Sequence, residues 1–488
     1  MSPAGHGGLL GNENVYKHGT SNLIECMENF ENRDTIAAIA TPLGEGGVGI
    51  VRISGPESRD IGERIFSSAK EAFSGLKPYV LHHGWIFDNS NRILDEVLMS
   101  YMPGPASYTG EDVVEINCHG GPAVLQSILQ LVLALGVRAA NAGEFTLRGF
   151  LNNRLDLTQA ESVAEMISAQ SESGINIAGS KLQGDLQVLV QRLRERLERL
   201  RSELTAELDF PEDETDTLGN EDLGARLEEV KKEVLLLLEN YDKYSCWRDG
   251  ALAVLTGRVN AGKSSLLNAL LGHSRAIVTS IPGTTRDYLE EKINLGGLPL
   301  RLIDTAGWRE ARDAIEKVGL EKLQELIQDS QLVCLVFDLS IDEPGELKDL
   351  ALKLGSDKVL GVGNKADLAF APEHFGRWLS DHGFEWVALS AKSGKGMDDL
   401  HRALGQRLVG NSSEPAQGEL VPNIRQRDLL LKTRQELDSL QAELGEDLPF
   451  DILEMRLQQI CNLLGEITGD ISSDDILERI FSRFCIGK

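Results

Sequence analysis

The stretch GRVNAGKS, residues 257–264, is a complete GxxxxGK[ST] motif and sets the architecture of the middle of the chain. It follows the apolar run ALAVLTG (251–257) and runs into SSLLNALLG (264–272), which predicts a strand, a turn and a helix. In such a turn, glycine allows backbone N–H groups to point at phosphates, while a lysine neutralises the β and γ charge and a hydroxyl coordinates Mg²⁺. The motif therefore predicts a nucleoside triphosphate site. Its predicted phosphate-binding residues are Asn260, Ala261, Gly262, Lys263, Ser264 and Ser265.

The base of the nucleotide is indicated by Asn364-Lys365-Ala366-Asp367, which follows the apolar run KVLGVG (358–363). In GTPases of this pattern, the aspartate carboxylate accepts hydrogen bonds from guanine N1–H and from the exocyclic amine, which adenine does not present there. NKxD alone is a weak signal, but Ser390-Ala391-Lys392 ends the next expected strand and would bring the Ala391 amide near guanine O6. The ordered set predicts GTP.

Two segments between these motifs are expected to be switches. Asp304-Thr305-Ala306-Gly307 ends the run LRLID, and we expect its Asp304 in the Mg²⁺ shell and its Gly307 amide at the γ-phosphate. In Gly283-Thr284-Thr285-Arg286-Asp287, Thr285 would complete the metal shell in the triphosphate state. The alternative for Asp304 is an ordinary turn or helix-cap residue. We therefore predict Ser264 and Thr285 as Mg²⁺ ligands.

The residue after Gly307 is Trp308, which has no acceptor to align an attacking water, so hydrolysis needs another group. The nearby carboxylates are Glu310, Asp313 and Glu316. From the residues alone these three are equivalent, and they could equally form a solvated helix face.

Asn260 lies inside the phosphate loop and would place a carbonyl oxygen beside the phosphates. A monovalent cation held there could supply the charge stabilisation that an arginine finger otherwise gives. The alternative is that Asn260 only forms the turn.

The organisation of the chain predicts several domains, since 488 residues suggest about three units. Short apolar runs broken by Gly and Pro extend from Asp34 to about Asn152 and predict an α+β domain with one amphipathic helix after Gly120-Gly121. Leucines then recur at helical spacing up to Leu208, and helix returns from Asn423 to Lys488. Between these flanks, apolar runs alternate with helices, which predicts a parallel sheet with helices on both faces.

Because neither helical flank has an obvious second core, we expect the two to pack together and the α/β unit to be inserted in a split helical domain. The predicted boundaries are a disordered extension at 1–32, an N-terminal domain at 33–152, a first helical segment at 153–248, a G domain at 249–409 and a second helical segment at 410–488.

Composition limits the classes of function. Lys and Arg total 49 against 76 Asp and Glu, a formal charge of −27, so any contact with nucleic acid needs a local basic patch. The six cysteines form no CxxC pair, which favours reduced thiols. No run approaches the roughly 20 apolar residues of a membrane span, and no leader segment is apparent. We expect a cytoplasmic protein with no membrane partner.

The nucleotide motifs, GTTRD, Asn260, the N-terminal GGVGIVRISG, the middle FTLRGFLNNRLDLTQAE and the terminal FCIGK closely resemble the MnmE (TrmE) family of tRNA-modification GTPases. The resemblance runs from about Asp34 to Lys488. It implies an N-terminal tetrahydrofolate-binding domain that also dimerises, a split helical domain and an inserted Ras-like G domain.

Site residues follow from the resemblance position by position. The family's potassium site falls on Asn260, Thr279, Ile281 and Thr284, with Ser280 in the same nucleotide-binding segment, and its water-positioning glutamate falls on Glu316. Pro282 and Trp308 depart from the Ala and Leu expected there. The family's folate contacts fall on Arg52, Glu115, Arg154 and Lys488. Arg154 replaces an expected Lys, which keeps the charge but changes the donor geometry.

The tail Cys485-Ile486-Gly487-Lys488 formally resembles a prenylation box, but Gly is not aliphatic and Lys is atypical as the last residue, so we reject lipidation. The resemblance implies that this tail reaches the folate site, where Cys485 is a candidate catalytic residue. The alternative is a small residue packed at a domain seam.

We therefore predict a K⁺-dependent GTPase, activated by G-domain dimerisation, that modifies C5 of wobble uridine in tRNA. The resemblance implies an FAD-dependent partner similar to MnmG (GidA) in a heterotetramer, and a 5,10-methylene- or 5-formyl-tetrahydrofolate cofactor. One alternative is a ribosome-assembly or RNA-binding switch GTPase without covalent chemistry, but the chain beyond Val409 carries no GxxG of a KH module. A dynamin-like membrane remodeller would need an amphipathic basic or apolar insertion that the sequence lacks.

Overall fold

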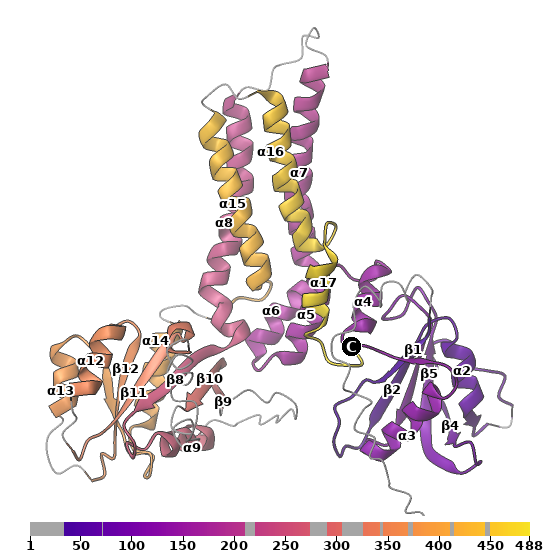
Figure 1. Ribbon diagram of the computed structural model, residues 1–488, viewed down its shortest axis with the longest axis horizontal. Coiled ribbons are helices and arrows are strands. Elements are labelled where there is room, and N and C mark those ends of the chain that lie inside the picture. Colours follow the sequence, from indigo (N-terminus) through magenta and orange to yellow (C-terminus); the bar gives the residue numbers. More distant parts are fainter. Residues whose placement is uncertain are drawn as a thin grey trace, which may run out of the picture. The chain divides into compact units, whose positions relative to one another are not determined.

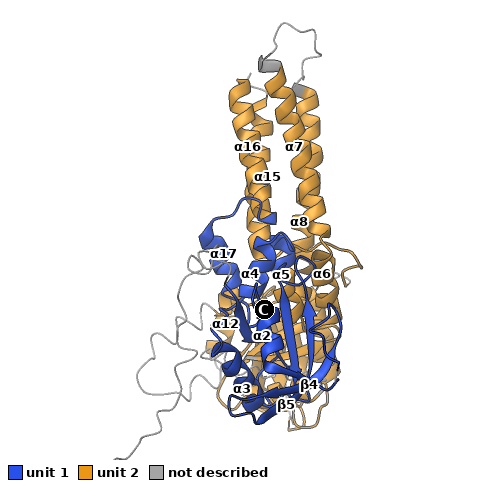
Figure 2. Ribbon diagram, turned by 90° about the vertical axis from the view of Figure 1, so that its right-hand side faces the viewer, with its two compact units in different colours: residues 1–161, 468–488 blue, residues 162–467 orange. Residues whose placement is uncertain are grey.

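The computed structural model describes residues 34–70, 72–209, 220–273, 290–304, 326–341, 345–368, 374–409, 414–444 and 449–488. The extension expected at 1–32 lies outside these residues. The chain divides into two compact units, one of Met1–Glu161 with Thr468–Lys488 and one of Ser162–Ile467 (Figure 2).

The first unit is built on a seven-stranded sheet with the order β3-β4-β5-β6-β2-β1-β7. Figure 1 labels β1, β2, β4 and β5 of this sheet. Its neighbouring strands pair antiparallel, except that β1 and β7 are parallel. The strands are β1 (Ile36–Ile39), β2 (Gly49–Ser54), β3 (Phe66–Ser68), β4 (His82–Phe87), β5 (Ile93–Met102), β6 (Val113–Cys118) and β7 (Arg138–Ala139). The helices are α2 (Ser58–Ile65), α3 (Pro122–Leu133), α4 (Glu144–Leu151) and α17 (Asp474–Phe481), while α5 (Leu157–Ser168) crosses the boundary between the units.

Buried and less buried residues alternate along strands β2 and β6 of this sheet, and the buried ones lie on the face that α3 covers. Val51 and Ile53 of β2 and Ile116 of β6 are buried in one cluster with Leu125 and Ile128 of α3. The α+β prediction is confirmed, including the helix after Gly120-Gly121. Helices α2 and α4 were not predicted, because runs of eight residues are too short to display a helical period.

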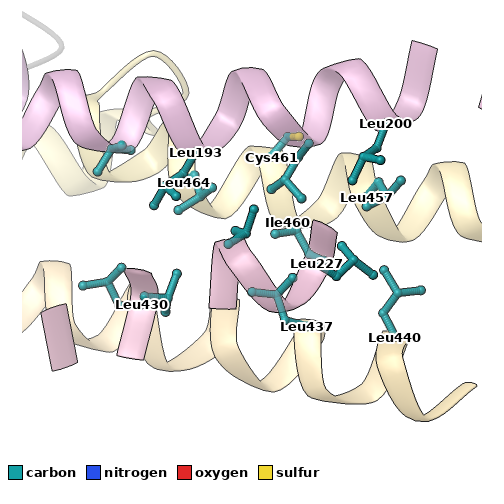
Figure 3. Close-up of a cluster of buried hydrophobic side chains, with 14 of the residues drawn as sticks. Leu193, Leu200, Leu227, Leu430, Leu437, Leu440, Leu457, Ile460, Cys461 and Leu464 are labelled. Atoms are coloured by element: carbon teal, nitrogen blue, oxygen red, sulfur yellow. The ribbon is translucent and has the colours of Figure 1, made fainter. Parts of the chain in front are cut away.

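The second unit contains a bundle made from both helical flanks. Buried leucines of all four long helices form one cluster, in which Leu193 and Leu200 lie among Leu227, Leu437 and Leu457 (Figure 3). The long helices are α7 (Asp185–Asp209), α8 (Asn220–Asp249), α15 (Ile424–Glu443) and α16 (Phe450–Thr468), with α6 (Glu172–Leu182) before them. Since each flank alone would leave its leucine stripe in water, the split helical domain is confirmed by this shared core.

The α/β region of the second unit has a six-stranded sheet with the order β13-β12-β11-β8-β10-β9. The strands are β8 (Ala251–Gly257), β9 (Glu290–Leu295), β10 (Leu298–Asp304), β11 (Leu332–Asp338), β12 (Val359–Asn364) and β13 (Trp386–Ala388). The helices are α9 (Lys263–His273), α12 (Gly345–Leu354), α13 (His374–Asp381) and α14 (Met397–Val409).

The expectation of a fully parallel sheet is wrong at the edge strand. β9 pairs antiparallel with β10, while the other pairs are parallel. The reason is the turn Gly296-Gly297, where both residues have positive φ (60° and 98°), as a tight hairpin requires. The run INLGGLPLRLID therefore forms two strands.

The turn of this hairpin packs on the helical region of the same unit. Leu298 is buried with Ile177, Tyr244, Trp247 and Val421 in one apolar cluster. The Asn294 side-chain N–H donates to the carbonyl of Gln170 at 3.3 Å. The hairpin of β9 and β10, whose second strand ends at Asp304, is thus in direct contact with α6 and α8.

The expectation of helix up to Lys488 is wrong for the last seven residues. Helix α17 ends at Phe481, and Ile486 forms an antiparallel bridge with Ala142. The residues after Phe481 instead form turns and this bridge, and Gly487 has φ of 94°, which a regular helix does not accommodate. Among the helices that the structure describes, none has the length and apolar character needed to cross a membrane.

Candidate functional site

The phosphate loop joins the C-terminal end of β8 to the N-terminus of α9. Gly257 has φ of 146°, and a Cβ there would lie 2.0 Å from the Val336 carbonyl oxygen. Gly262 has φ of 92°, and a Cβ there would lie 2.1 Å from Asn364 Nδ2. Both motif glycines are therefore required by positive φ and by close contact with neighbouring strand ends.

Lys263, only 6% exposed, lies over this loop. Its Nζ donates to the carbonyls of Gly257 at 3.0 Å and Arg258 at 2.8 Å. The ammonium is thus held at the mouth of the loop, beside the N-terminus of α9, where anions bind well.

The Ser264 hydroxyl donates to Asp304 Oδ2 at 2.8 Å. These two residues come from α9 and from the end of β10, which is the neighbour of β8 in the sheet. Their oxygens are hard donors of the kind that Mg²⁺ prefers, so the pair fits a magnesium site. Ser265 follows on the exposed side of α9.

Asn260 is exposed and has φ of 67°, a left-handed conformation that Asn tolerates better than most residues. This geometry suits a turn, and it also leaves the side chain at the surface of the loop. Ala261 closes the turn by donating from its N–H to the Arg258 carbonyl at 3.3 Å.

The Asn364 side chain forms hydrogen bonds with the three loops that follow β8, β12 and β13. Its Nδ2 donates to the Ala261 carbonyl at 3.0 Å. Its Oδ1 accepts from the backbone N–H groups of Lys365 at 2.8 Å and Ala391 at 3.0 Å. Asn364 is 3% exposed, so these hydrogen bonds are shielded from water and hold the loops after β12 and β13, the guanine-side loops, to the phosphate loop.

Asp367 is exposed at the same edge of the sheet. A hydrogen bond with the Ser390 side chain, and then the charge of Lys392, lower the pKa of Asp367 below its ordinary value. An ionised carboxylate there is an acceptor only, as hydrogen bonding to guanine N–H donors demands.

One residue at this edge, Asp338, was not among those predicted from the sequence, and its Oδ2 lies 2.6 Å from Lys365 Nζ. The sequence does contain a pattern that indicates Asp338: it is the last residue of a buried apolar strand. The carboxyl ends of such strands meet at one edge of a parallel sheet.

The predicted folate residues lie in the first unit. Arg52 of β2 is directly opposite Glu115 of β6 in the sheet register. Its Nε and Nη2 are both 2.8 Å from Glu115 Oε1, and its Nη1 donates to the Gly487 carbonyl at 3.2 Å. The guanidinium also lies over the rings of Tyr108 and Phe145, at 5.3 and 5.6 Å from their centroids.

Lys488 belongs to the same cluster. Burial, and after it the charge of Arg52, lowers the pKa of Lys488 below its ordinary value. Cations for an anionic tail and a carboxylate for N–H donors, framed by two aromatic rings, fit the chemistry of a reduced folate. The structure thus brings together Arg52, Glu115 and Lys488.

Arg154 is not a member of this cluster. It is exposed in the turn after α4, and its backbone N–H donates to the Gly149 carbonyl at 2.8 Å. Among the residues that the structure describes, no hydrogen bond or ion pair joins its side chain to Arg52, Glu115 or Lys488. Cys485 is exposed and is a free thiol.

Several predicted residues lie outside the described residues of the chain, so their roles stay predictions. They are Thr279, Ser280, Ile281, Pro282, Thr284, Thr285, Gly307, Trp308, Glu310, Asp313 and Glu316.

Known proteins and family models match this chain over most of its length. A family model described as the GTP-binding protein TrmE N-terminus matches residues 35–154, and one described as the MnmE helical domain matches residues 157–485. The tRNA modification GTPase MnmE of Nitratidesulfovibrio vulgaris (strain DP4) is 46% identical over 463 residues, covering 94% of this chain and 100% of that protein. The protein of the same name from Bacillus subtilis (strain 168) is 37% identical, covering 93% and 100%.

Among solved structures, the G domain of the T. maritima FeoB iron transporter is 25% identical, with a TM-score of 0.26, and the match covers 32% of this chain and 98% of that one. The two MnmE proteins are 46% and 37% identical to this chain over nearly its whole length, and the MnmE helical-domain model matches residues 157–485. The chain therefore belongs to the MnmE family of tRNA modification GTPases.

Proposed function

We propose that this GTPase acts with an FAD-dependent partner resembling MnmG (GidA) to add a carboxymethylaminomethyl or aminomethyl group to C5 of wobble uridine in certain tRNAs. A tetrahydrofolate derivative would supply the one-carbon unit. The observation that carries the proposal is the presence, in one chain, of the phosphate loop hydrogen-bonded through Asn364 to the loop at Ala391 and of the Arg52, Glu115 and Lys488 cluster.

On the nucleotide side, we assign roles by the chemistry of each group. Lys263 and the phosphate-loop amides would bind the β- and γ-phosphates, and Asp367 the guanine edge, with Ser390, Ala391 and Lys392 around it. Ser264 and Thr285 would hold Mg²⁺, with Asp304 in the metal shell. Asn260, Thr279, Ile281 and Thr284 would hold K⁺, and Glu316 would orient the water.

The potassium assignment predicts a specific ion dependence. GTP turnover should be faster in K⁺ than in Na⁺ at equal ionic strength, by about tenfold or more, because the cation stabilises charge that develops in the transition state. Initial rates of phosphate release measure this. Asn260→Ala should remove the difference, with Val259→Ala, at an exposed position of the same loop, as the matched control. Equal rates in both ions would take Asn260 out of this role.

On the folate side, Glu115 would accept hydrogen bonds from the N–H groups of the pterin. Arg52, Arg154 and Lys488 would bind the anionic tail, and Cys485 is a candidate for the modification chemistry. The contact of Arg52 with the Gly487 carbonyl supports a role for the tail in this cluster.

Folate affinity distinguishes this proposal from a switch GTPase without covalent chemistry. Calorimetry with 5-formyltetrahydrofolate should detect binding to the full chain, and deletion of Lys488 should weaken it by about tenfold or more through loss of a charge-assisted contact. Lys432→Ala, on α15, is the control, and it should leave the affinity unchanged. A chain without affinity for reduced folate would favour the switch GTPase.

We propose that GTP turnover drives conformational change rather than carbon chemistry. Closure of two G domains would rearrange the helices. The apolar contact of the hairpin residue Leu298 with Trp247 supports transmission of this movement from the sheet to α8.

The proposed assembly is a homodimer through the N-terminal domain and a heterotetramer with the partner, in the cytoplasm where tRNA matures. We also propose that the domains of this chain span residues 33–152, 153–248, 249–409 and 410–488.

The whole proposal is tested by reconstitution with the partner, FAD, reduced folate, GTP and unmodified tRNA, and by mass spectrometry of the wobble nucleoside. The expected result is a C5 adduct that forms only when all of these components are present. A nucleoside that stays unmodified, while GTP is hydrolysed at a normal rate, would contradict it.

A further inference from the structure

Asp338 lies where the guanine-side loops meet. It is the last residue of β11 and lies opposite Asn364, the last residue of β12, in the parallel register. The next backbone N–H, of Leu339, donates to the Asn364 carbonyl at 3.0 Å. Asp338 is therefore joined through the backbone to the residue that connects the guanine-side loops to the phosphate loop.

Lys365, the residue after Asn364, has φ of 64°. A left-handed conformation is unfavourable for a long side chain with a Cβ, and it persists only where the surroundings hold it. Two contacts do so here. The Lys365 backbone N–H donates to Asn364 Oδ1 at 2.8 Å, and its Nζ donates to Asp338 Oδ2 at 2.6 Å.

Asp338 is itself held from its other side. Its Oδ1 accepts from the Ser340 backbone N–H at 2.9 Å and from the Ser340 hydroxyl at 2.6 Å. Burial would raise the pKa of Asp338, but the Lys365 ammonium and the two Ser340 donors bring that pKa below its ordinary value. The carboxylate is thus ionised at neutral pH and has one orientation.

The ion pair differs from a solvated surface pair in its exposure. The Asp338 side chain is 9% exposed and that of Lys365 is 31% exposed. A short, partly buried pair with one partner fixed by further hydrogen bonds restricts the other partner more than an exposed pair does.

We propose that Asp338 is a positioning residue of the guanine site. By anchoring Lys365 Nζ, it keeps residue 365 in its left-handed turn and so places Asp367, two residues later, for its bonds to guanine. This inference rests on the proposed role of Asp367 in binding guanine.

The test uses the full chain and a fluorescent GDP analogue. In Asp338→Asn, the dissociation constant should rise by about tenfold or more, which is the usual scale for loss of a hydrogen bond to a charged group. The increase should come from faster dissociation, and kcat at saturating GTP should stay within about twofold of the wild type. The matched control is Asp399→Asn, which breaks an exposed pair with Arg402 in the same domain and should change neither value.

A double-mutant cycle separates positioning from general stability. If Asp338 acts through Lys365, Asp338→Asn should add almost nothing to the loss already caused by Lys365→Met. Additive losses would overturn the inference, because they would mean that Asp338 supports the domain by another route. A merely unstable variant would lower the fraction of protein that binds, without changing the dissociation constant of the rest.

If Asp338→Asn does not fold, Ser340→Ala decides the question, because it removes one donor that orients Asp338. It should raise the dissociation constant in the same direction by a smaller factor, and an unchanged value would overturn the inference. Wild-type protein that binds no guanine nucleotide would remove the proposed guanine site itself. Normal wild-type binding with an unaffected Asp338→Asn would remove only the role of Asp338.

Discussion

Replacing Lys263 by alanine is expected to lower the rate of GTP hydrolysis by at least about a hundredfold, the usual scale for loss of one group that stabilises transition-state charge. Lys263 Nζ is held by the carbonyls of Gly257 and Arg258, so it is already positioned beside the loop that would bind the phosphates. Without it, the β and γ charge would be met by backbone amides and Mg²⁺ alone. Single-turnover hydrolysis measures the effect.

The control is Lys353→Ala, which removes an exposed lysine from α12 of the same sheet domain and should leave the rate unchanged. If tRNA modification depends on GTP turnover, modification by the reconstituted system should fall together with hydrolysis in Lys263→Ala. A rate within about threefold of the wild type would contradict the assignment of the phosphate loop.

The second large effect is expected at Arg148, in the N-terminal sheet unit. This guanidinium is 1% exposed and is bonded to three carboxylates, those of Asp34, Glu111 and Glu144. Glu144 is itself 2% exposed, so Arg148→Met would leave a buried carboxylate that has only Arg138 as a cationic partner among the described residues. We expect a loss of about 3–5 kcal/mol in the free energy of unfolding of this unit, as for other broken buried pairs.

Because a chain with several domains does not unfold in two states, the effect should be read locally. Hydrogen exchange of peptides from β2 and β6 reports the opening of the first unit. Arg192→Met is the matched control, because Arg192 is 54% exposed and pairs with Glu233 on the helical bundle. It should cost less than about 1 kcal/mol. Equal exchange in the two variants would show that the Arg148 network does not stabilise the sheet.

The strand, turn and helix of the proposed nucleotide site could be predicted from the sequence because the information for them is local. The phosphate loop needs only a strand, a turn and a helix that are contiguous in sequence, and the structure has these as β8, residues 258–262 and α9. NKAD and SAK follow two further strands, whose carboxyl ends meet at one edge of a parallel sheet. The period of the leucines likewise predicted the long helix α7.

The N-terminal cluster could not be predicted in the same way. Arg52 and Glu115 are far apart in sequence and meet only through the register of β2 and β6, which a slip of one residue would change. The contact of Arg52 with the Gly487 carbonyl depends on where the tail returns to the sheet. From the residues alone, Arg52 and Glu115 were ordinary charges, and only the family resemblance indicated them.

Sequence by itself determined which chemistry this chain carries, because the nucleotide motifs, the helical periods and the resemblance to a family are written in neighbouring residues. The tertiary structure alone decided which distant groups meet: Arg52 with the tail, Asp338 with Lys365, and the leucines of α7 and α8 with those of α15 and α16. The physical reason is that strand register, burial and the packing of helices are properties of the whole folded chain, whereas a turn or a helical stripe is satisfied by its own segment.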